Sequence, residues 1–338
     1  VLRGEKVKDV DAEYPKTLNV VVNHDMAKEL GIDVSSISDE ESKASTQDDK
    51  PIAKKDKGVI KLKVNKSSKK GFSNVVLTAI SQGLLWAIMA IGVFITFRIL
   101  DLADLTAEGA FPLGAATTTI MIIRGINPIF ATLGGFVAGM LAGAVSGFMH
   151  TKMKIPALLT GIITLTGLYS VNLLVLGSAN VSLSGHNTLV TMVMNLGLSK
   201  LNGVILLGLI FVSLVVLMLV VLLNTQVGLA LRATGDNLAM GEANGIKVDR
   251  MKILGYMISN GLIALSGALL AQNNGYADMN MGTGTIVNGL AAIILAEVIV
   301  KYLPLGKRLW SIVVGAVLYR LVLVIILAMN VDAQMLKL

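Results

Sequence analysis

Ionisable side chains inside long apolar stretches are the residues of this chain best placed to do chemistry. Glu108, Glu297 and Arg320 each lie in such a stretch. Charge is costly inside a membrane, so these groups are functional candidates by default, as proton relays, ion sites or solute contacts. Each also has a structural explanation. Glu108 could cap the helix that it begins, and Glu297 could pair with Lys301, four residues later. Arg320 could extend to the interface, or pair with Asp332 or with a carboxylate on another helix.

The sequence contains no recognisable catalytic or metal-binding constellation. Cysteine is absent, which excludes a thiol nucleophile, a disulfide and a cysteine metal site. The three histidines, His24, His150 and His186, are far apart. A glycine-rich phosphate loop ending in Gly-Lys-Ser/Thr is also missing, so we do not expect this chain to hydrolyse ATP. We predict a non-catalytic protein with no catalytic residue, no metal and no cofactor.

A polar segment, residues 231–246, separates two apolar runs. Its middle, Leu238 to Ala243, favours a short helix bracketed by Gly235 and Gly245. A connecting loop needs only a few turn residues, so a helix here indicates a docking surface. A local explanation is also open, in which Asp236 or Asn237 is the helix N-cap and Glu242 is merely solvated. That explanation accounts for where the helix starts but not for its presence.

The composition is that of a membrane protein. Hydrophobic residues make up 54% of the 338 residues and charged residues 15%, against about 25% charged in soluble domains. Because a spanning helix needs about 20 mainly apolar residues, we predict an all-α integral membrane protein, a polytopic bundle of about eight transmembrane helices with a short cytoplasmic coupling helix. The predicted spans are 75–97, 107–123, 129–149, 156–177, 202–224, 253–273, 286–300 and 309–330.

Two spans have unusual composition. The second contains Glu108, Pro112 and Gly114, and we expect it to be broken or only partly inserted, which is tolerated where protein covers the backbone. The third has glycines four residues apart, at Gly135, Gly139 and Gly143. That spacing is typical of closely packed membrane helices.

Loop charges predict the topology. The loops near residues 150–154, 232–252 and 301–308 are basic and evenly spaced, so they share one side, which the positive-inside rule makes cytoplasmic. Counting back, the first span runs from outside to inside. A lysine tract before it would then lie outside the cell. Either the count of spans is wrong by one, or the long N-terminal part is translocated regardless of its charge.

More than half of the charged residues lie in residues 1–71. Residues 1–33 have a short strand pattern and a short helix pattern, and residues 34–71 form a charged, lysine-rich flexible linker. The transmembrane domain is predicted over 72–338. The net charge of +7 comes from the lysine tract and the ends of apolar runs, so it does not indicate nucleic acid. We expect the chain to be a piece of a longer protein, with a final helix cut off.

Three segments resemble ABC importer permeases of the branched-chain amino acid and ribose type, most closely permeases assigned to tryptophan and tyrosine. The segment from Arg232 to Ile246 is similar to the family's coupling loop. Leu100 to Ala115 looks like an early span, and Gly282 to Glu297 like a late one. Ala296 departs from the glycine usual before that glutamate, so Glu297 inherits no special role. The stretches Tyr14 to Asn23 and Met26 to Ile32 are similar to the C-terminal end of the lipoprotein-type binding proteins that partner these permeases.

The resemblance implies a mechanism and partners. Two permease subunits, expected as a homodimer in the plasma membrane of a bacterium, form the pathway for a small solute. Separate ABC ATPase subunits grip the coupling helices, and an extracellular substrate-binding protein or domain delivers the solute. The implied coupling residues are Arg232, Gly235, Asp236, Asn237, Met240, Glu242, Ala243, Gly245 and Ile246, flanked by Lys247, Arg250 and Lys252.

Several alternatives stay open at this stage. The expected solute is an aromatic amino acid, with a branched-chain amino acid or a ribose-like sugar as alternatives. A stand-alone channel or secondary transporter, or a membrane anchor for the N-terminal part, are other readings of the same spans. Residues 1–33 are expected to be the remnant of a fused binding domain, or alternatively an artefact of gene assembly.

Overall fold

The computed structural model describes residues 68–195, 197–299 and 304–328. By its internal contacts the chain divides into two units, 1–71 and 72–338, and the second contains the fold described below. The predicted remnant at 1–33 and most of the predicted linker lie outside the described residues. The linker's last four residues, 68–71, instead begin the first described helix.

The described residues are mostly helical, in agreement with the predicted all-α class. In chain order the helices are α3 (Ser68–Phe94), continued by the π-helical turn η2 (Ile95–Ile99), α4 (Thr106–Ile123), α5 (Pro128–Thr151), α6 (Ala157–Leu176), α7 (Leu189–Met194), α8 (Lys200–Asn224), α9 (Gln226–Asp236), α10 (Leu238–Ala243), α11 (Val248–Asn274), the 3₁₀ turn η3 (Met279–Gly282), α12 (Thr285–Ile299) and α13 (Leu305–Ala328). Two short strands that the sequence did not suggest, β1 (Asn180–Ser182) and β2 (Tyr276–Asp278), pair antiparallel.

Each of the eight predicted spans coincides with a helix over its described residues, and within the described ranges seven helical segments are long and apolar enough to cross a membrane. The remaining one, α4, forms a single unbroken helix around Pro112, so the prediction of a broken span is wrong. Glu108, Pro112 and several threonines lower its hydropathy. Because 13 of its 18 residues are buried by neighbouring helices, α4 has little need of a lipid-compatible surface.

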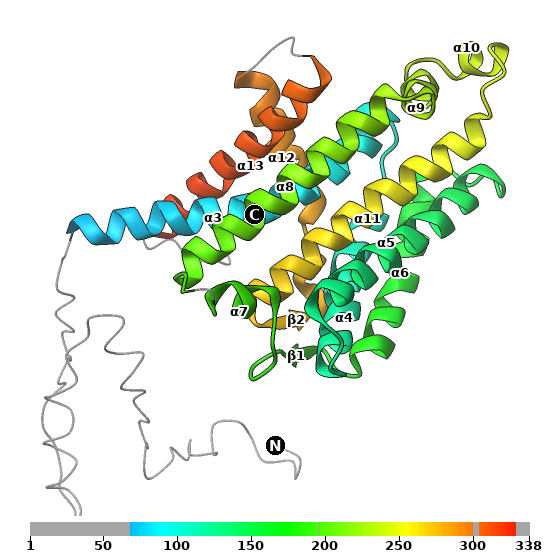
Figure 1. Cartoon of the computed structure of the whole chain (residues 1–338). Coiled ribbons are helices and arrows are strands. Elements are labelled where there is room, and N and C mark those ends of the chain that lie inside the picture. Colours follow the sequence, from blue (N-terminus) through cyan, green and yellow to red (C-terminus); the bar gives the residue numbers. More distant parts are fainter. Residues whose placement is uncertain (1–67, 196, 300–303, 329–338) are drawn as a thin grey trace, which may run out of the picture. The chain divides into compact units, whose positions relative to one another are not determined.

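The helix ends gather at two opposite ends of this unit. Figure 1 shows α9 and α10 at one end, called here the coupling end, and α7, β1 and β2 at the other. Lys152 after α5 forms an ion pair with Asp249 at the start of α11, with 2.9 Å between Nζ and Oδ2. Two of the three basic loops are therefore neighbours, as predicted. The last turn of α3 also reaches this end, because Ile99 contacts Gly235 of α9. The first span thus runs toward the coupling end, as the count back from the basic loops predicted.

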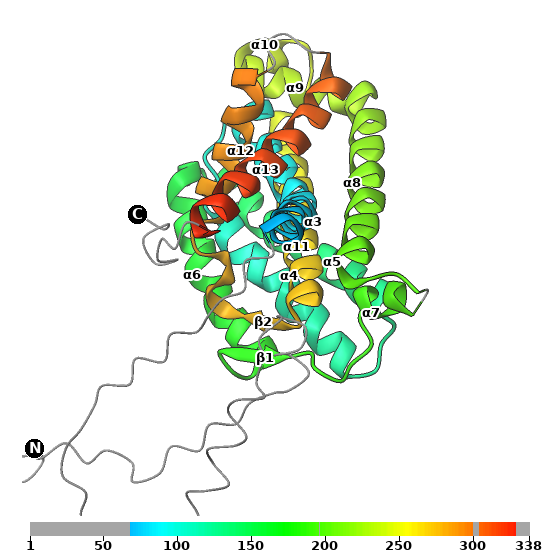
Figure 2. The ribbon, with the colours of Figure 1, turned by 90° about the vertical axis from the view of Figure 1, so that its left-hand side faces the viewer.

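The helices α3 and α11 form the centre of the unit. Figure 2 shows both between α6 and α8, which lie on opposite flanks. Phe94 and Ile88 of α3 and Leu262 and Ile263 of α11 are almost completely buried in one apolar cluster. The flanking helices keep apolar surfaces suited to contact with lipid, where Leu174 and Leu217 are among the most exposed apolar side chains.

Glycines of α5 pack directly on α11, as the four-residue spacing predicted. A Cβ at Gly143 would overlap the carbonyl oxygen of Tyr256, and one at Gly139 would overlap the carbonyl oxygen of Asn260. The absence of these Cβ atoms lets the two backbones approach closely, which is the usual basis of helix association in membranes.

Two glycine-to-alanine changes test this contact. Gly143→Ala forces α5 and α11 apart, and overpacking of this kind costs about 1–3 kcal/mol. Gly167→Ala is the matched control, because no atom lies within 4 Å of a Cβ built at Gly167 in α6. Thermal unfolding in detergent should give a lower midpoint for Gly143→Ala and an unchanged or higher one for Gly167→Ala. Equal midpoints for the two variants would contradict the packing described here.

Candidate functional site

A sharp corner joins α8 to α9 at the coupling end. The Thr225 hydroxyl caps α9 by accepting the Gly228 N–H. Arg232 lies half-buried on α9 and donates from Nη2 to the carbonyl oxygen of Leu223, the two atoms being 3.1 Å apart. The predicted coupling residue Arg232 therefore holds α9 against the end of α8.

The inner face of α9 packs on the end of α3. Leu231 and Thr234 are 1% exposed. A Cβ at Gly235 would overlap the carbonyl oxygen of Ile99, so only glycine permits this approach. Because of this close contact, a displacement of α9 would also move η2 and the loop that follows it, residues 100–105.

Helix α10 has the bounds predicted for it, Leu238–Ala243. Its N-cap is Asn237, whose Oδ1 accepts the Met240 N–H at 3.0 Å. At its other end Gly245 has a φ of +76°, and the Ile246 N–H donates to the Gly241 carbonyl oxygen at 3.0 Å. The helix is therefore closed at both ends by local hydrogen bonds, although six residues are too few for stability in isolation.

The outward surface of α10 combines apolar and charged side chains. Leu238 is 44% and Met240 65% exposed, and Glu242 is exposed between them and the basic residues Lys247 and Arg250. Of the other predicted coupling residues, Asp236, Asn237 and Ala243 are exposed, whereas Gly245 and Ile246 form the turn that ends the helix. The predicted set thus divides into residues that position α9 and α10 and residues that face outward.

Glu297 lies in a cluster of charges near the coupling end. Its carboxylate pairs with Arg98 of η2 and with Nη2 of Arg308 on α13, the latter at 2.8 Å. The predicted partner, Lys301, lies outside the described residues. The guanidinium of Arg308 also covers the ring of Phe94, 5.0 Å from the ring centre. Glu297 therefore joins α3, α12 and α13, which supports a structural role.

The charge cluster makes a testable prediction for stability. Glu297→Gln removes the anion between two arginines, so their mutual repulsion is no longer offset, and the unfolding midpoint should fall by several degrees. A double variant, Glu297→Gln with Arg98→Gln, should recover part of that loss, as expected for interacting residues. Strictly additive midpoints in thermal unfolding would show that Arg98 and Glu297 do not interact.

Arg320 lies over an aromatic ring. Its guanidinium carbon is 4.4 Å from the ring centre of Trp86, which stacks on Phe111 of α4 at 5.4 Å. The neighbouring Tyr319 donates its hydroxyl to Oδ1 of Asn288. Within the described ranges no carboxylate pairs with Arg320, and Asp332 lies outside them. A cation–π contact, which the sequence did not suggest, accommodates this charge.

Glu108 does not cap its own helix. Its Oε1 accepts the Gly284 N–H at 3.1 Å, at the start of α12. The N-cap of α4 is Leu105, which forms no side-chain cap, and Oδ1 of the preceding Asp104 accepts the Thr106 N–H at 2.9 Å. Glu108 therefore joins the early span to the late one, although the two are far apart in the sequence.

A buried polar pair was missed by the sequence analysis. Asp104 is 1% exposed, and its Oδ2 accepts Nδ2 of Asn260 in α11 at 2.7 Å. Nearby, the hydroxyls of Thr106 and Ser146 are 2.7 Å apart. The available signals were an Asp two residues before a Thr, which is typical of a helix cap, and an asparagine inside an apolar run.

Comparison with known proteins agrees with this architecture. A family model described as "Branched-chain amino acid transport system / permease component" matches residues 75–336. The chain is 39% identical over 263 residues to a tyrosine transport system permease protein of Clostridioides difficile, which covers 78% of this chain and 86% of the relative. An autoinducer 2 import system permease protein of Salmonella paratyphi B is 27% identical over 220 residues, 64% of this chain and 60% of the relative. No solved structure matches.

These matches cover nearly the whole helical unit and include its coupling end. Together with the candidate spans, they identify a multi-pass protein of the bacterial plasma membrane. Permease components of this kind are membrane subunits without catalytic activity of their own. The chain belongs to the branched-chain amino acid transport system permease family and is an ABC permease for a small solute.

Proposed function

We propose that the outward surface of α9 and α10 is where an ABC ATPase subunit docks, and that two copies of this chain form the solute pathway of an importer. The observation that supports docking is the exposure of Leu238 and Met240 on a short helix that is capped at both ends. An apolar surface rimmed by charges of both signs is typical of a protein interface.

The contacts of α9 supply a route from this surface to the pathway. Movement of the docked ATPase displaces α9, and Gly235 transmits that displacement to Ile99. The loop after η2 holds Asp104, which is bonded to Asn260 halfway along α11. ATP binding and hydrolysis in the partner thereby change the packing of α3, α4 and α11, which alternates access between the two sides of the membrane.

The proposed solute is an aromatic amino acid. Support comes from the 39% identical relative, whose name is a tyrosine transport system permease. A ribose-like solute is the second candidate, because a more distant relative is an autoinducer 2 import permease. A binding protein, separate or fused before residue 72, would deliver the solute from outside.

Docking is tested by co-purification. The permease would be expressed with a candidate ABC ATPase from the same organism, and the segment Gly235 to Ile246 would be replaced by a flexible linker of equal length. The expected result is loss of the ATPase from the purified complex. Retention of the ATPase at wild-type stoichiometry would refute docking at α10. Tyrosine uptake by the permease alone, without any ATPase, would favour a stand-alone transporter.

A further inference from the structure

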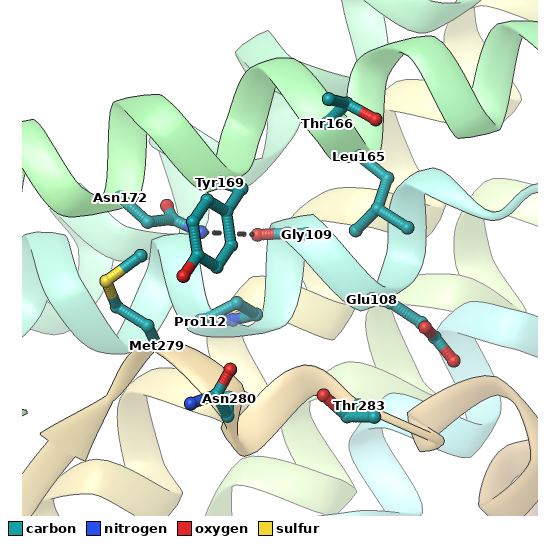
Figure 3. Close-up of a pocket in the computed structure, with 10 residues that line it drawn as sticks. All are labelled: Glu108, Gly109, Pro112, Leu165, Thr166, Tyr169, Asn172, Met279, Asn280 and Thr283. Carbon is teal, nitrogen blue, oxygen red and sulfur yellow. Dashed lines mark hydrogen bonds between the residues drawn. The ribbon is translucent and has the colours of Figure 1, made fainter. Parts of the chain in front are cut away.

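A cavity of about 360 Å³ lies between α4, α6 and η3 (Figure 3). This volume is within the range of small-molecule sites. One part of its wall is apolar and consists of Pro112, Leu165 and Met279. The ring of Tyr169, 53% exposed, stands at its edge. A planar or branched apolar group fits such a wall.

The remainder of the wall is polar and includes one carboxylate, that of Glu108. Glu108 is half-buried, and its Oε1 accepts the Gly284 N–H at 3.1 Å. No lysine or arginine lines the cavity, and none within the described ranges pairs with this carboxylate. Figure 3 shows the Glu108 carboxylate directed toward the segment that contains Thr283. The N-terminal end of α12 carries a partial positive charge from its free backbone N–H groups. It is therefore the nearest group that stabilises the negative charge of the Glu108 carboxylate.

A buried amide lies in the same wall. Asn172 is 1% exposed and donates from Nδ2 to the Gly109 carbonyl oxygen at 3.2 Å, the bond drawn in Figure 3. Its Oδ1 is buried and has no hydrogen-bond partner among the described residues. A buried acceptor without a donor is costly. Within the described ranges, the lining of the cavity thus contains one carboxylate and no positively charged side chain.

The edge of the cavity is polar where a lipid-facing surface would be apolar. Thr166 is exposed halfway along α6, and Asn280 and Thr283 are exposed on the segment that enters α12. Polar groups at this depth normally face protein or a water-filled cavity. A polar edge of this kind is compatible with an opening onto a water-filled pathway.

We propose that this cavity binds the protonated amine of the transported solute at the Glu108 carboxylate, with the solute's apolar group against Pro112, Leu165 and Met279. The ligand class is an amphipathic primary amine, such as an aromatic amino acid. This proposal rests on the proposed function, because it assigns a site to the same solute. The ammonium donates to the Glu108 oxygen that does not accept the Gly284 N–H.

The test is equilibrium binding of radiolabelled tyrosine to the permease–ATPase complex in nanodiscs. Tyramine, which keeps the amine, should compete, whereas 4-hydroxyphenylpropionate, which lacks it, should not. Glu108→Gln should weaken tyrosine binding about tenfold or more, because a charge-assisted hydrogen bond becomes a neutral one. The glutamine still offers an oxygen to Gly284, so the fold is preserved, and ATPase co-purification checks this.

Asp101→Asn is the matched control, since it also converts a carboxylate to an amide. Asp101 is exposed and has a φ of +55°, which asparagine tolerates. Wild-type tyrosine binding by Glu108→Gln, or competition by the deaminated acid equal to that by tyramine, would overturn the site while leaving the proposed function intact. A wild-type complex that contains its ATPase but neither binds nor transports any amine would refute the proposed solute, and this site with it.

Discussion

Met240→Glu is expected to reduce solute uptake and ATPase retention about tenfold or more, the size of effect seen when a central interface residue is lost. Met240 is 65% exposed at the coupling end, and its side chain makes little contribution to the core. A carboxylate there would be desolvated without a partner on docking, so binding of the ATPase would weaken while the permease stays folded. Co-purified ATPase and uptake by reconstituted vesicles are the measurements.

Met153→Glu provides the comparison for this effect. Met153 follows α5 near the Lys152–Asp249 ion pair and is 59% exposed. The same chemical change at similar exposure should leave uptake within about twofold of wild type, as expected for most surface substitutions. If both variants lose the ATPase equally, the docking surface extends beyond α10. If neither does, Met240 has no part in docking.

Asp104→Ala is expected to destabilise the protein by about 3 kcal/mol, the cost of leaving buried donors unsatisfied. The Asp104 carboxylate accepts hydrogen bonds from the Thr106 N–H and from Nδ2 of Asn260. Alanine leaves both donors buried without an acceptor. Asp104→Asn should cost less, because its amide oxygen can still accept the Thr106 N–H and Asn260 can rotate its unpartnered Oδ1 toward the new amide.

A charge exchange tests the same pair by a different route. Asn260→Asp places two carboxylates together in the core, and we expect the lowest unfolding midpoint of the series. Adding Asp104→Asn removes one of the two carboxylates and should recover most of the loss. If Asp104→Ala unfolds at the wild-type temperature, or the exchange gives no recovery, the Asp104–Asn260 pair does not hold α4 to α11.

The positions of the helices along the chain were largely predictable from the sequence. Apolar run length determined the helical spans, and loop charge determined which loops share an end, because both are properties of contiguous sequence. Helix α10 was predicted to the residue, since Asn237 and Gly245 carry its caps on either side of it. The preceding helix α9 was missed, because its polar and apolar residues looked like part of the connecting loop.

The partners of single charges were not predictable in the same way. Glu108 was assigned to its own helix but accepts a hydrogen bond from Gly284, and Glu297 pairs with Arg98, about 200 residues away. Sequence separation says nothing about such pairs, because they depend on which helices pack together. The break before α12, with Gly284 at a φ of +77°, is what lets Glu108 reach a free N–H.

The sequence by itself determined the membrane-spanning class, the shared end of two basic loops and the position of the short helix α10, since each depends on the composition of one continuous segment. The tertiary structure decided which polar groups meet: Asp104 with Asn260, Arg320 over Trp86, and Glu108 with Asn172 around one cavity. The physical reason is that an unpaired polar group is costly inside a membrane, so every helix contact is constrained by where such groups find partners.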